Sequence, residues 1–219
     1  MMRLFQSLVF ALLFSVPMLA AETKTVLVLG DSIAAGYGLD PEEAFPALLQ
    51  EKVDKSGLPY KVVNAGLSGD TTAGGLRRIR WLLRQKVDVL LLELGGNDGL
   101  RGIDPDETRK NLRGIIAKVK EKNPNALIVI AGMQMPENMG KDYTTRFRDV
   151  FPTVAREHNA TLIPFFLEGV GGKADLNQAD RIHPTAEGHR IIAATIWKVL
   201  QPVLTGTAAN PSIRESASR

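Results

Sequence analysis

The stretch TVLVLGDS, residues 25–32, decides the fold of this chain and also marks its chemistry. Its first five residues form an apolar, β-branched run, which favours a β-strand over Thr25–Leu29. The run ends in Gly30-Asp31-Ser32, so the strand would deliver a serine hydroxyl to its carboxyl end. In parallel α/β sheets ligands bind at that end, so partners of this serine are expected at the ends of the other strands.

Similar strand patterns recur along the chain, and each is followed by a helix pattern. The later strands are expected at Tyr60–Asn64, Val87–Leu92, Ala126–Ala131 and Thr161–Pro164. The third strand is a continuous apolar run, which indicates burial on both faces. Helices are expected at residues 40–56, 72–85, 104–122, 143–158 and 184–204.

Two of these helices begin with clear start signals. Asp40-Pro41-Glu42-Glu43 and Asp104-Pro105-Asp106-Glu107 each combine a capping aspartate, a proline at the first helical position and acids near the positive helix end. Five strands alternating with five helices predict an α/β fold, a three-layer α/β/α sandwich around a five-stranded parallel sheet. The flavodoxin-like strand order 2-1-3-4-5 is expected, although pattern alone does not specify the order.

Length and composition are those of one globular domain. The 219 residues suffice for one large core, and 44% hydrophobic with 23% charged residues is ordinary. The chain has no cysteine, which excludes disulfides, thiolate zinc sites, a cysteine nucleophile and a lipoprotein anchor. A net charge of +3 is too small to predict a nucleic-acid partner. A cluster of four arginines in one expected helix is interpreted as a solvated face: Arg77, Arg78, Arg80 and Arg84.

The two ends of the chain are expected to lie outside the domain at 22–204. Residues 1–21 have the pattern of a secretory signal, with Arg3 before an apolar run and small residues near 20 and 21. The alternative is a retained membrane anchor, for which the run is short. Cleavage would leave no membrane span and predicts a periplasmic or secreted location. Residues 205–219 are small and polar, and a flexible tail is expected there.

Three further segments, at expected strand ends or just before the last helix, carry polar residues typical of active sites. They are Gly66-Leu67-Ser68-Gly69-Asp70, Gly95-Gly96-Asn97-Asp98 and Asp180-Arg181-Ile182-His183-Pro184. In a parallel sheet these segments would converge with Ser32 on one edge. Each motif alone is common in turns, but all of them in this order are far more specific.

Together these segments supply the groups that acyl transfer needs. A serine hydroxyl becomes a nucleophile only when a base removes its proton, and the chain has three histidines. His158 is expected on the surface and His189 on a helix face. His183 lies on a loop before the last helix, so it is the expected base for Ser32. Asp180 could reach the imidazole Nδ1–H and fix its tautomer.

Donors for the developing oxyanion are present as well. The backbone N–H of Ser32 stands at the start of a helical turn. Gly69 offers a backbone N–H with no side chain to block approach, and Asn97 offers a side-chain amide.

At these residues the chain closely resembles the SGNH, or GDSL-type, hydrolase family. The family blocks are named for serine, glycine, asparagine and histidine, which match Ser32, Gly69, Asn97 and His183. The usual Gly-Asp-Ser-Leu is Gly30-Asp31-Ser32-Ile33 here, and Asp180 fits the family's Asp-x-x-His pair. The resemblance covers about residues 24–204.

The resemblance extends to the periplasmic multifunctional esterases of thioesterase I type, through GGNDGLRG at 95–102 and LIPFF at 162–166. It implies a serine esterase and thioesterase that acts on aryl esters, acyl-CoA and lysophospholipids, with no metal or other cofactor. The expected partners are small-molecule acyl esters and thioesters. It also implies a shallow acyl groove, lined by Gly99, Leu100, Arg101, Gly102, Ile103, Met135 and Pro136.

Four other interpretations compete with this one. The glycines after the first strand lack the G-x-G-x-x-G spacing of dinucleotide binding, and Asn64 stands where an acid would be needed. A metal-dependent phosphoesterase would need more ligands than two histidines and an aspartate. A non-catalytic exported binding module would have lost a catalytic group. A carbohydrate O-acetyl esterase would keep the same triad, so the motifs leave that substrate class open.

Overall fold

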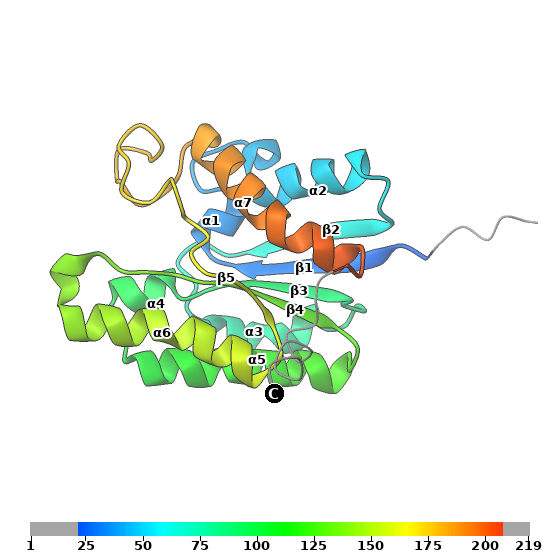
Figure 1. Ribbon diagram of the computed structural model, residues 1–219, viewed down its shortest axis with the longest axis horizontal. Helices are drawn as coiled ribbons and strands as arrows, with labels where there is room; N and C mark the ends of the chain where they lie inside the picture. Colours follow the sequence, from blue (N-terminus) through cyan, green and yellow to red (C-terminus); the bar gives the residue numbers. More distant parts are fainter. Residues whose placement is uncertain (1–21, 208–219) are drawn as a thin grey trace, which may run out of the picture.

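The structure is a computed structural model that describes residues 22–207. The expected signal at 1–21 and residues 208–219 of the expected tail lie outside the described residues. Five strands form one parallel sheet in the order β2-β1-β3-β4-β5, which confirms the predicted fold class and strand order (Figure 1). They are β1 (Lys24–Gly30), β2 (Tyr60–Gly66), β3 (Val89–Glu93), β4 (Leu127–Ala131) and β5 (Thr161–Ile163).

Helices cover both faces of the sheet. Figure 1 shows α2 and α7 on one face and α3, α5 and α6 on the other. The long helices are α2 (Phe45–Lys55), α3 (Thr72–Leu82), α5 (Pro105–Lys122), α6 (Lys141–Glu157) and α7 (Ala186–Leu204). The short elements are α1 (Ser32–Ala35), α4 (Gly96–Leu100) and the 3-10 turns η1 (Pro41–Glu43) and η2 (Glu137–Met139).

The central strands are apolar on both faces, so the two helical layers bury them completely. Every residue of β3 is buried, as is β1 from Val26 onward. The register pairs Gly30 at the end of β1 with Gly66 of β2 on one side and with Glu93 of β3 on the other. The carboxyl ends of these three strands therefore meet at one edge, directly before the segments that carry the candidate site.

Two short helices lie at this edge. The helical turn expected at Ser32 is α1, whereas α4 was not predicted, because five residues give no detectable helical periodicity. Helix α1 begins at Ser32, and the Asp31 side chain caps it by accepting from Ile33 N at 3.0 Å. Gly36, with φ of 76°, ends it in the left-handed conformation that glycine favours. Helix α4 begins at Gly96, so Asn97 lies in its first turn.

The prediction of a continuous helix over 40–56 is wrong at its start. Residues 41–43 form only the 3-10 turn η1, Asp40 makes no side-chain cap, and α2 begins at Phe45. Pro46 provides the reason. In a helix starting at residue 41, its ring would clash with the carbonyl four residues earlier, whereas in the first turn of α2 it is tolerated.

The last helix also starts later than predicted, at Ala186 rather than at Pro184. Thr185 is its cap, since the hydroxyl accepts from Gly188 N at 3.3 Å. Smaller differences are confined to element ends. Helix α3 ends at residue 82 rather than 85, and β3 begins at residue 89 rather than 87.

The interpretation of the arginine cluster as one solvated face is wrong for Arg78. Its Nε donates to Asp70 Oδ2 at 2.6 Å, and its guanidinium also donates to the Gly30 carbonyl at 3.0 Å. The other three arginines of the cluster are exposed. Arg78 thus ties α3 to the end of β1.

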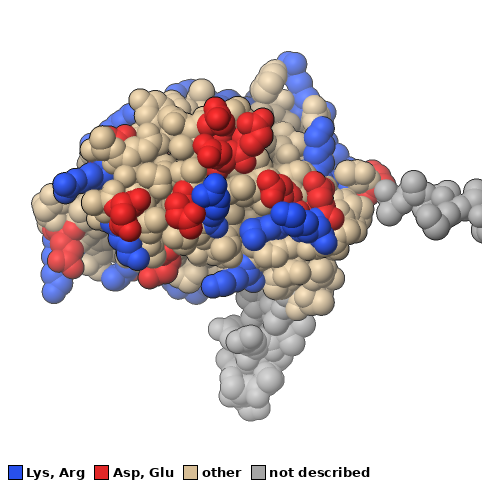
Figure 2. All heavy atoms as spheres, turned by 90° about the horizontal axis from the view of Figure 1, so that it is seen from above, with Lys and Arg blue, Asp and Glu red and all other residues tan. Residues whose placement is uncertain are grey.

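The face of the molecule formed by α2 and α7 is of mixed charge. Figure 2, which looks onto the α2 and α7 layer, shows basic side chains beside acidic ones across that face. Such a mixture is typical of a solvated surface. Between residues 22 and 207, no helix combines the length and the apolar character that crossing a membrane requires.

The packing of β2 against α1 can be tested by Gly66→Ala. A Cβ at Gly66 would come within 2.3 Å of the backbone nitrogen of Ala35. A backbone atom cannot move aside as easily as the end of a flexible side chain. We therefore expect the free energy of unfolding to fall by about 1–3 kcal/mol. Denaturation in urea measures this loss.

Gly114→Ala is the matched control for that substitution. A Cβ at Gly114 would meet only the end of the Leu76 side chain, at 2.9 Å. Alanine also has a higher helix propensity than glycine, and Gly114 lies in the interior of helix α5. Equal stability of the two variants would contradict the close approach of β2 and α1.

Candidate active site

Ser32, His183 and Asp180 form a chain of hydrogen bonds at the carboxyl edge of the sheet. Ser32 is the first residue of α1, and its Oγ lies 2.9 Å from His183 Nε2. His183 Nδ1 lies 2.6 Å from Asp180 Oδ2. The structure thus brings together the three residues that the sequence pattern grouped. A hydroxyl, an imidazole and a carboxylate in this order can remove the proton from the serine.

A tight turn holds Asp180 against the imidazole. Asp180 Oδ1 accepts from the backbone N–H of Ile182 at 2.9 Å and of His183 at 3.0 Å. The His183 side chain, together with these two backbone donors, lowers the pKa of Asp180 to about 2. The carboxylate is therefore ionised at neutral pH. It accepts Nδ1–H, which leaves Nε2 as the acceptor for the serine proton.

Two residues that the sequence pattern did not reveal, Tyr37 and Gln178, fix the loop that carries His183. Gln178 Nε2 donates to the carbonyls of Tyr37 at 2.7 Å and of Pro184 at 3.1 Å. Gln178 N donates to the His183 carbonyl at 2.7 Å. The Tyr37 ring lies beside the imidazole, with 4.4 Å between the ring centroids. Such contacts between distant loops leave no periodic signal in a sequence.

Two buried carboxyl groups, those of Asp31 and Glu93, lie next to Ser32. Asp31 N donates to Glu93 Oε2 at 3.1 Å. Glu93 is only 1% exposed, and its Oε1 has no hydrogen-bond partner among the described residues. Burial raises the pKa of Asp31 to about 6 and raises the pKa of Glu93 well above its usual value. The neutral form of Glu93 is thus favoured, and Asp31 is the acid of the pair that ionises more readily.

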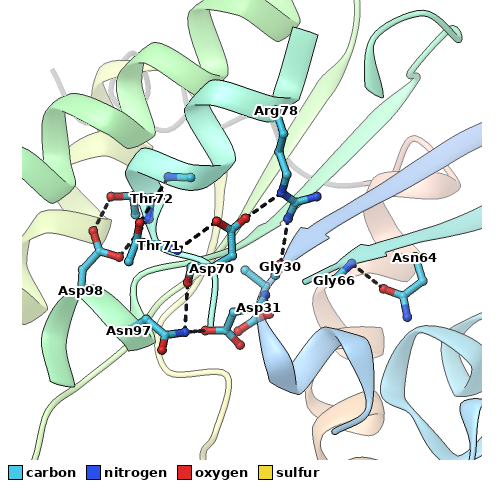
Figure 3. Close-up of polar contacts among 12 residues, drawn as sticks. Gly30, Asp31, Asn64, Gly66, Asp70, Thr71, Thr72, Arg78, Asn97 and Asp98 are labelled. Carbon is cyan, nitrogen blue, oxygen red and sulfur yellow. Dashed lines mark hydrogen bonds and ion pairs between the residues drawn. The ribbon is translucent and has the colours of Figure 1, made fainter. Parts of the chain in front are cut away.

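The Asn97 amide is held between two acceptors. Its Nδ2 donates to the Asp70 carbonyl at 3.0 Å and to Asp31 Oδ2 at 3.2 Å (Figure 3). The Asp70 carboxylate accepts in turn from Arg78 and, at 3.1 Å, from Thr71 N. Both amide hydrogens of Asn97 are therefore engaged. A ligand oxygen would compete with the longer of the two bonds, the one to Asp31.

The loop that carries Gly69 is anchored on both sides. Buried Asp98 accepts from Thr72 N at 2.9 Å and from the Thr72 hydroxyl (Figure 3), which joins α4 to α3. Arg101 donates to the Gly69 carbonyl at 3.1 Å. The N–H groups of Ser32 and Gly69 find no acceptor within residues 22–207, so both are available to a ligand.

A cavity of about 460 Å³ opens beside Ser32 and His183. Three of the expected groove residues line it: Leu100, Met135 and Pro136. Other apolar lining residues are Ile33, Met133, Phe165, Leu167 and Ile182. Most of the wall is thus apolar, and the candidate nucleophile is one of the residues that line it.

Four expected groove residues do not line the cavity: Gly99, Arg101, Gly102 and Ile103. A Cβ at Gly99 would lie 2.3 Å from Met135 Sδ, so this glycine supports the wall from behind. The carbonyl of Ile103 accepts from the Tyr143 hydroxyl at 2.9 Å, which turns this part of the loop toward α6.

The other two histidines form no contact with Ser32. His158 follows α6 as its C-cap and is partly buried. His189 in α7 is 1% exposed, and its Nδ1 accepts from Phe45 N at 3.0 Å. Burial lowers the pKa of His189 to about 4, so it is a neutral acceptor at the start of α2. Within the described chain, no group of three His, Asp or Glu side chains is arranged to ligate a metal ion.

Known proteins resemble this chain along most of its length. The model of the GDSL-like lipase/acylhydrolase family matches residues 28–191. Esterase TesA of Pseudomonas aeruginosa is 43% identical over 185 residues, which cover 84% of this chain and 91% of that protein. Thioesterase 1/protease 1/lysophospholipase L1 of Escherichia coli K12 is 41% identical over 186 residues, covering 84% and 87%. The crystal structure of TesA matches with a TM-score of 0.79 at 42% identity, covering 82% and 99%.

The burial of His189 predicts a specific loss of stability in acid. Its pKa in the folded chain, about 4, lies below the ordinary histidine pKa of 6.5, so unfolding takes up a proton between these pH values. The stabilisation is complete above pH 6.5 and is lost as the pH falls toward 4, by roughly 2–3 kcal/mol. We expect His189→Gln to be less stable than the parent at pH 7. Its free energy of unfolding should, however, fall less steeply than that of the parent as the pH is lowered.

Urea denaturation of both proteins at several pH values measures this difference. The raised pKa of Asp31 acts in the opposite direction over part of the same range, but it acts equally in both proteins. Parallel stability curves for His189→Gln and its parent would show that His189 is not held neutral.

Proposed function

The chain belongs to the GDSL-like lipase/acylhydrolase family, and we propose that it hydrolyses carboxylic esters and thioesters through an acyl-enzyme on Ser32. One observation carries the assignment of residues. Ser32 Oγ lies 2.9 Å from an imidazole nitrogen whose partner nitrogen lies 2.6 Å from an ionised carboxylate. This arrangement keeps Nε2 free of a proton and aimed at the nucleophile.

Acylation begins when His183 Nε2 takes the hydroxyl proton as Ser32 Oγ bonds to the substrate carbonyl carbon. The carbonyl electron pair moves onto its oxygen, and Asp180 stabilises the imidazolium through Nδ1–H. His183 then gives the proton to the leaving oxygen or sulfur as its bond to carbon breaks. A water molecule, deprotonated by His183, repeats the two steps and releases the acid from Ser32.

The oxyanion is stabilised by the N–H groups of Ser32 and Gly69 and by the Asn97 amide. The two backbone donors have no acceptor within the described chain, so they bind the oxyanion without breaking a bond. Asn97 has to exchange its 3.2 Å bond to Asp31 for one to the oxyanion. This exchange favours the transition state over the bound ester, because only a full oxyanion competes well with a carboxylate.

The acyl group occupies the apolar cavity beside Ser32. Methionine, leucine and phenylalanine side chains form its wall, and each buried methylene of an acyl chain contributes about 0.8 kcal/mol. An acetyl group would leave most of the 460 Å³ unfilled, which argues against a carbohydrate O-acetyl esterase. A non-catalytic binding module would not need the hydrogen-bonded chain of Ser32, His183 and Asp180.

Relatives of this chain carry names that fit these substrates. One is named an esterase, and another is named a thioesterase, a protease and a lysophospholipase. We propose aryl esters, acyl-CoA and lysophospholipids as substrates. We also propose that residues 1–21 direct export to the periplasm or beyond the cell, from the positive charge at Arg3 and the apolar run that follows it.

Replacement of Ser32 or His183 tests the nucleophile and the base. Ser32→Ala and His183→Ala should each lower kcat for a p-nitrophenyl ester by about 10⁴-fold or more. The double variant should be no worse than either single variant, because the two residues act as one unit. His158→Ala is the control and should keep its activity. Near-normal turnover by purified, folded Ser32→Ala would remove Ser32 from the reaction.

Asn97 separates this mechanism from one in which the backbone donors alone hold the oxyanion. Asn97→Ala should lower kcat by about 10²–10³-fold with little change in KM. Asn97→Asp should be at least as harmful, because it places a second carboxylate beside Asp31. The alternative is that Asn97 only joins α4 to its neighbours. A lower melting temperature with kcat unchanged in Asn97→Ala would support that alternative and contradict the proposed donor.

A further inference from the structure

We propose that Arg181 binds a phosphate group on the leaving side of the ester and so gives this site a preference for lysophospholipids over neutral esters of the same acyl chain. The inference rests on the proposed function of Ser32 and His183. Arg181 belongs to the long loop between β5 and α7, drawn in yellow to orange at the left of Figure 1. It lines the same cavity as Ser32.

The place of Arg181 in the chain puts it beside the departing group. During acylation the oxyanion faces Asn97 and Gly69, whereas the leaving oxygen must receive its proton from His183 Nε2. Arg181 lies two residues before His183, a separation of at most about 7 Å along the backbone. A charge on the leaving group, rather than on the acyl chain, is therefore within its reach.

The positive charge of Arg181 is also available to a ligand. It is the one lysine or arginine among the described residues that line the cavity. Its side chain has no hydrogen-bond or ion-pair partner within residues 22–207. The carboxylate of neighbouring Asp180 is occupied by His183 and by Ile182 N. Arg101, by contrast, already donates to the Gly69 carbonyl.

The backbone at Arg181 indicates that the side chain itself is useful. Its φ is 59°, in the left-handed region that glycine adopts without a steric penalty and that a side chain makes unfavourable. Arg181 N donates to the Gln178 carbonyl at 2.8 Å, which closes the turn. An arginine in such a position is strained where glycine would not be, as residues that contact ligands often are.

A guanidinium matches the geometry of phosphate, because two parallel N–H groups can bind two phosphate oxygens. In a lysophospholipid only the glycerol unit separates the ester oxygen from the phosphate. In acyl-CoA the whole pantetheine arm lies between the sulfur and the nearest phosphate, which carries that charge beyond a residue so close to His183. The structure therefore favours a glycerophosphate leaving group.

Three substrates with the same acyl chain test this assignment: lysophosphatidylglycerol, monoacylglycerol and acyl-CoA, each kept below its micelle concentration. For Arg181→Gly, we expect kcat/KM on lysophosphatidylglycerol relative to monoacylglycerol to fall about tenfold, mainly through KM. The ratio of kcat/KM on acyl-CoA to kcat/KM on monoacylglycerol should not change. Arg181→Lys should keep part of the selectivity, because it retains the charge but not the paired donors.

Arg181→Gly has an advantage as a variant, because glycine relieves the positive φ and the melting temperature should stay or rise. Arg84→Gly, which removes an exposed charge just beyond the end of α3, is the matched control and should leave both ratios unchanged. An unchanged lysophospholipid ratio in Arg181→Gly would overturn the assignment, as would an equal loss on acyl-CoA. Failure of the parent protein to hydrolyse any of the three would instead contradict the proposed function itself.

Discussion

The hydrogen bond between Ser32 Oγ and His183 Nε2 is the interaction on which the rest of the structure depends, and it joins residues 151 positions apart. The parallel sheet makes this contact possible. Strand β1 lies inside the sheet and delivers Ser32 to the carboxyl edge, where the loop before α7 returns with His183. Gln178 then fastens that loop to Tyr37, just beyond α1. The apolar core determines where the strands end, and the polar loop contacts set the distance between Ser32 and His183.

Burying the polar groups beneath the site is unfavourable in free energy, and the contacts that these groups make show what they contribute. Asp31 and Glu93 are buried next to each other, which raises both pKa values. Asp31 nevertheless caps α1 and holds the Asn97 amide. One carboxylate thus orients both the helix that begins at the proposed nucleophile and the amide of the proposed oxyanion donor. Arg78 completes the network by joining Asp70 to the end of β1. Pre-oriented dipoles of this kind need little rearrangement when charge develops in the transition state.

Much of this architecture could be predicted from the sequence, because apolar runs and strand-end motifs are local signals. The five strands, their parallel arrangement and the grouping of Ser32 with His183 and Asp180 all followed from such signals, whereas the strand order was expected without a local signal that specifies it. Helix α4 was not predicted, because its five residues are too few to give a recognisable helical periodicity. The start of α2 was misplaced because Asp40 and Pro41 gave a complete start signal that Pro46 overrode.

The contacts that complete the site could not be predicted, because they join residues far apart in the chain. Nothing in the pattern of α3 distinguishes Arg78 from its exposed neighbours, and only the fold brings it to Asp70 and Gly30. The same holds for Gln178, whose partner Tyr37 is 141 positions away. The groove was anticipated only in part, since Leu100 lines the cavity whereas Arg101 next to it turns toward Gly69. Side-chain direction in a loop depends on tertiary contacts rather than on local sequence.

The central claim is that the polar groups at this edge activate one serine and no other. The most direct measurement is to react the purified protein with a fluorophosphonate, digest it, and locate the adduct by mass spectrometry. Because the reagent requires a serine whose proton a base removes, one adduct per chain is predicted, on the peptide that contains Ser32. An adduct on another residue, or an unlabelled protein that still hydrolyses esters, would contradict the claim.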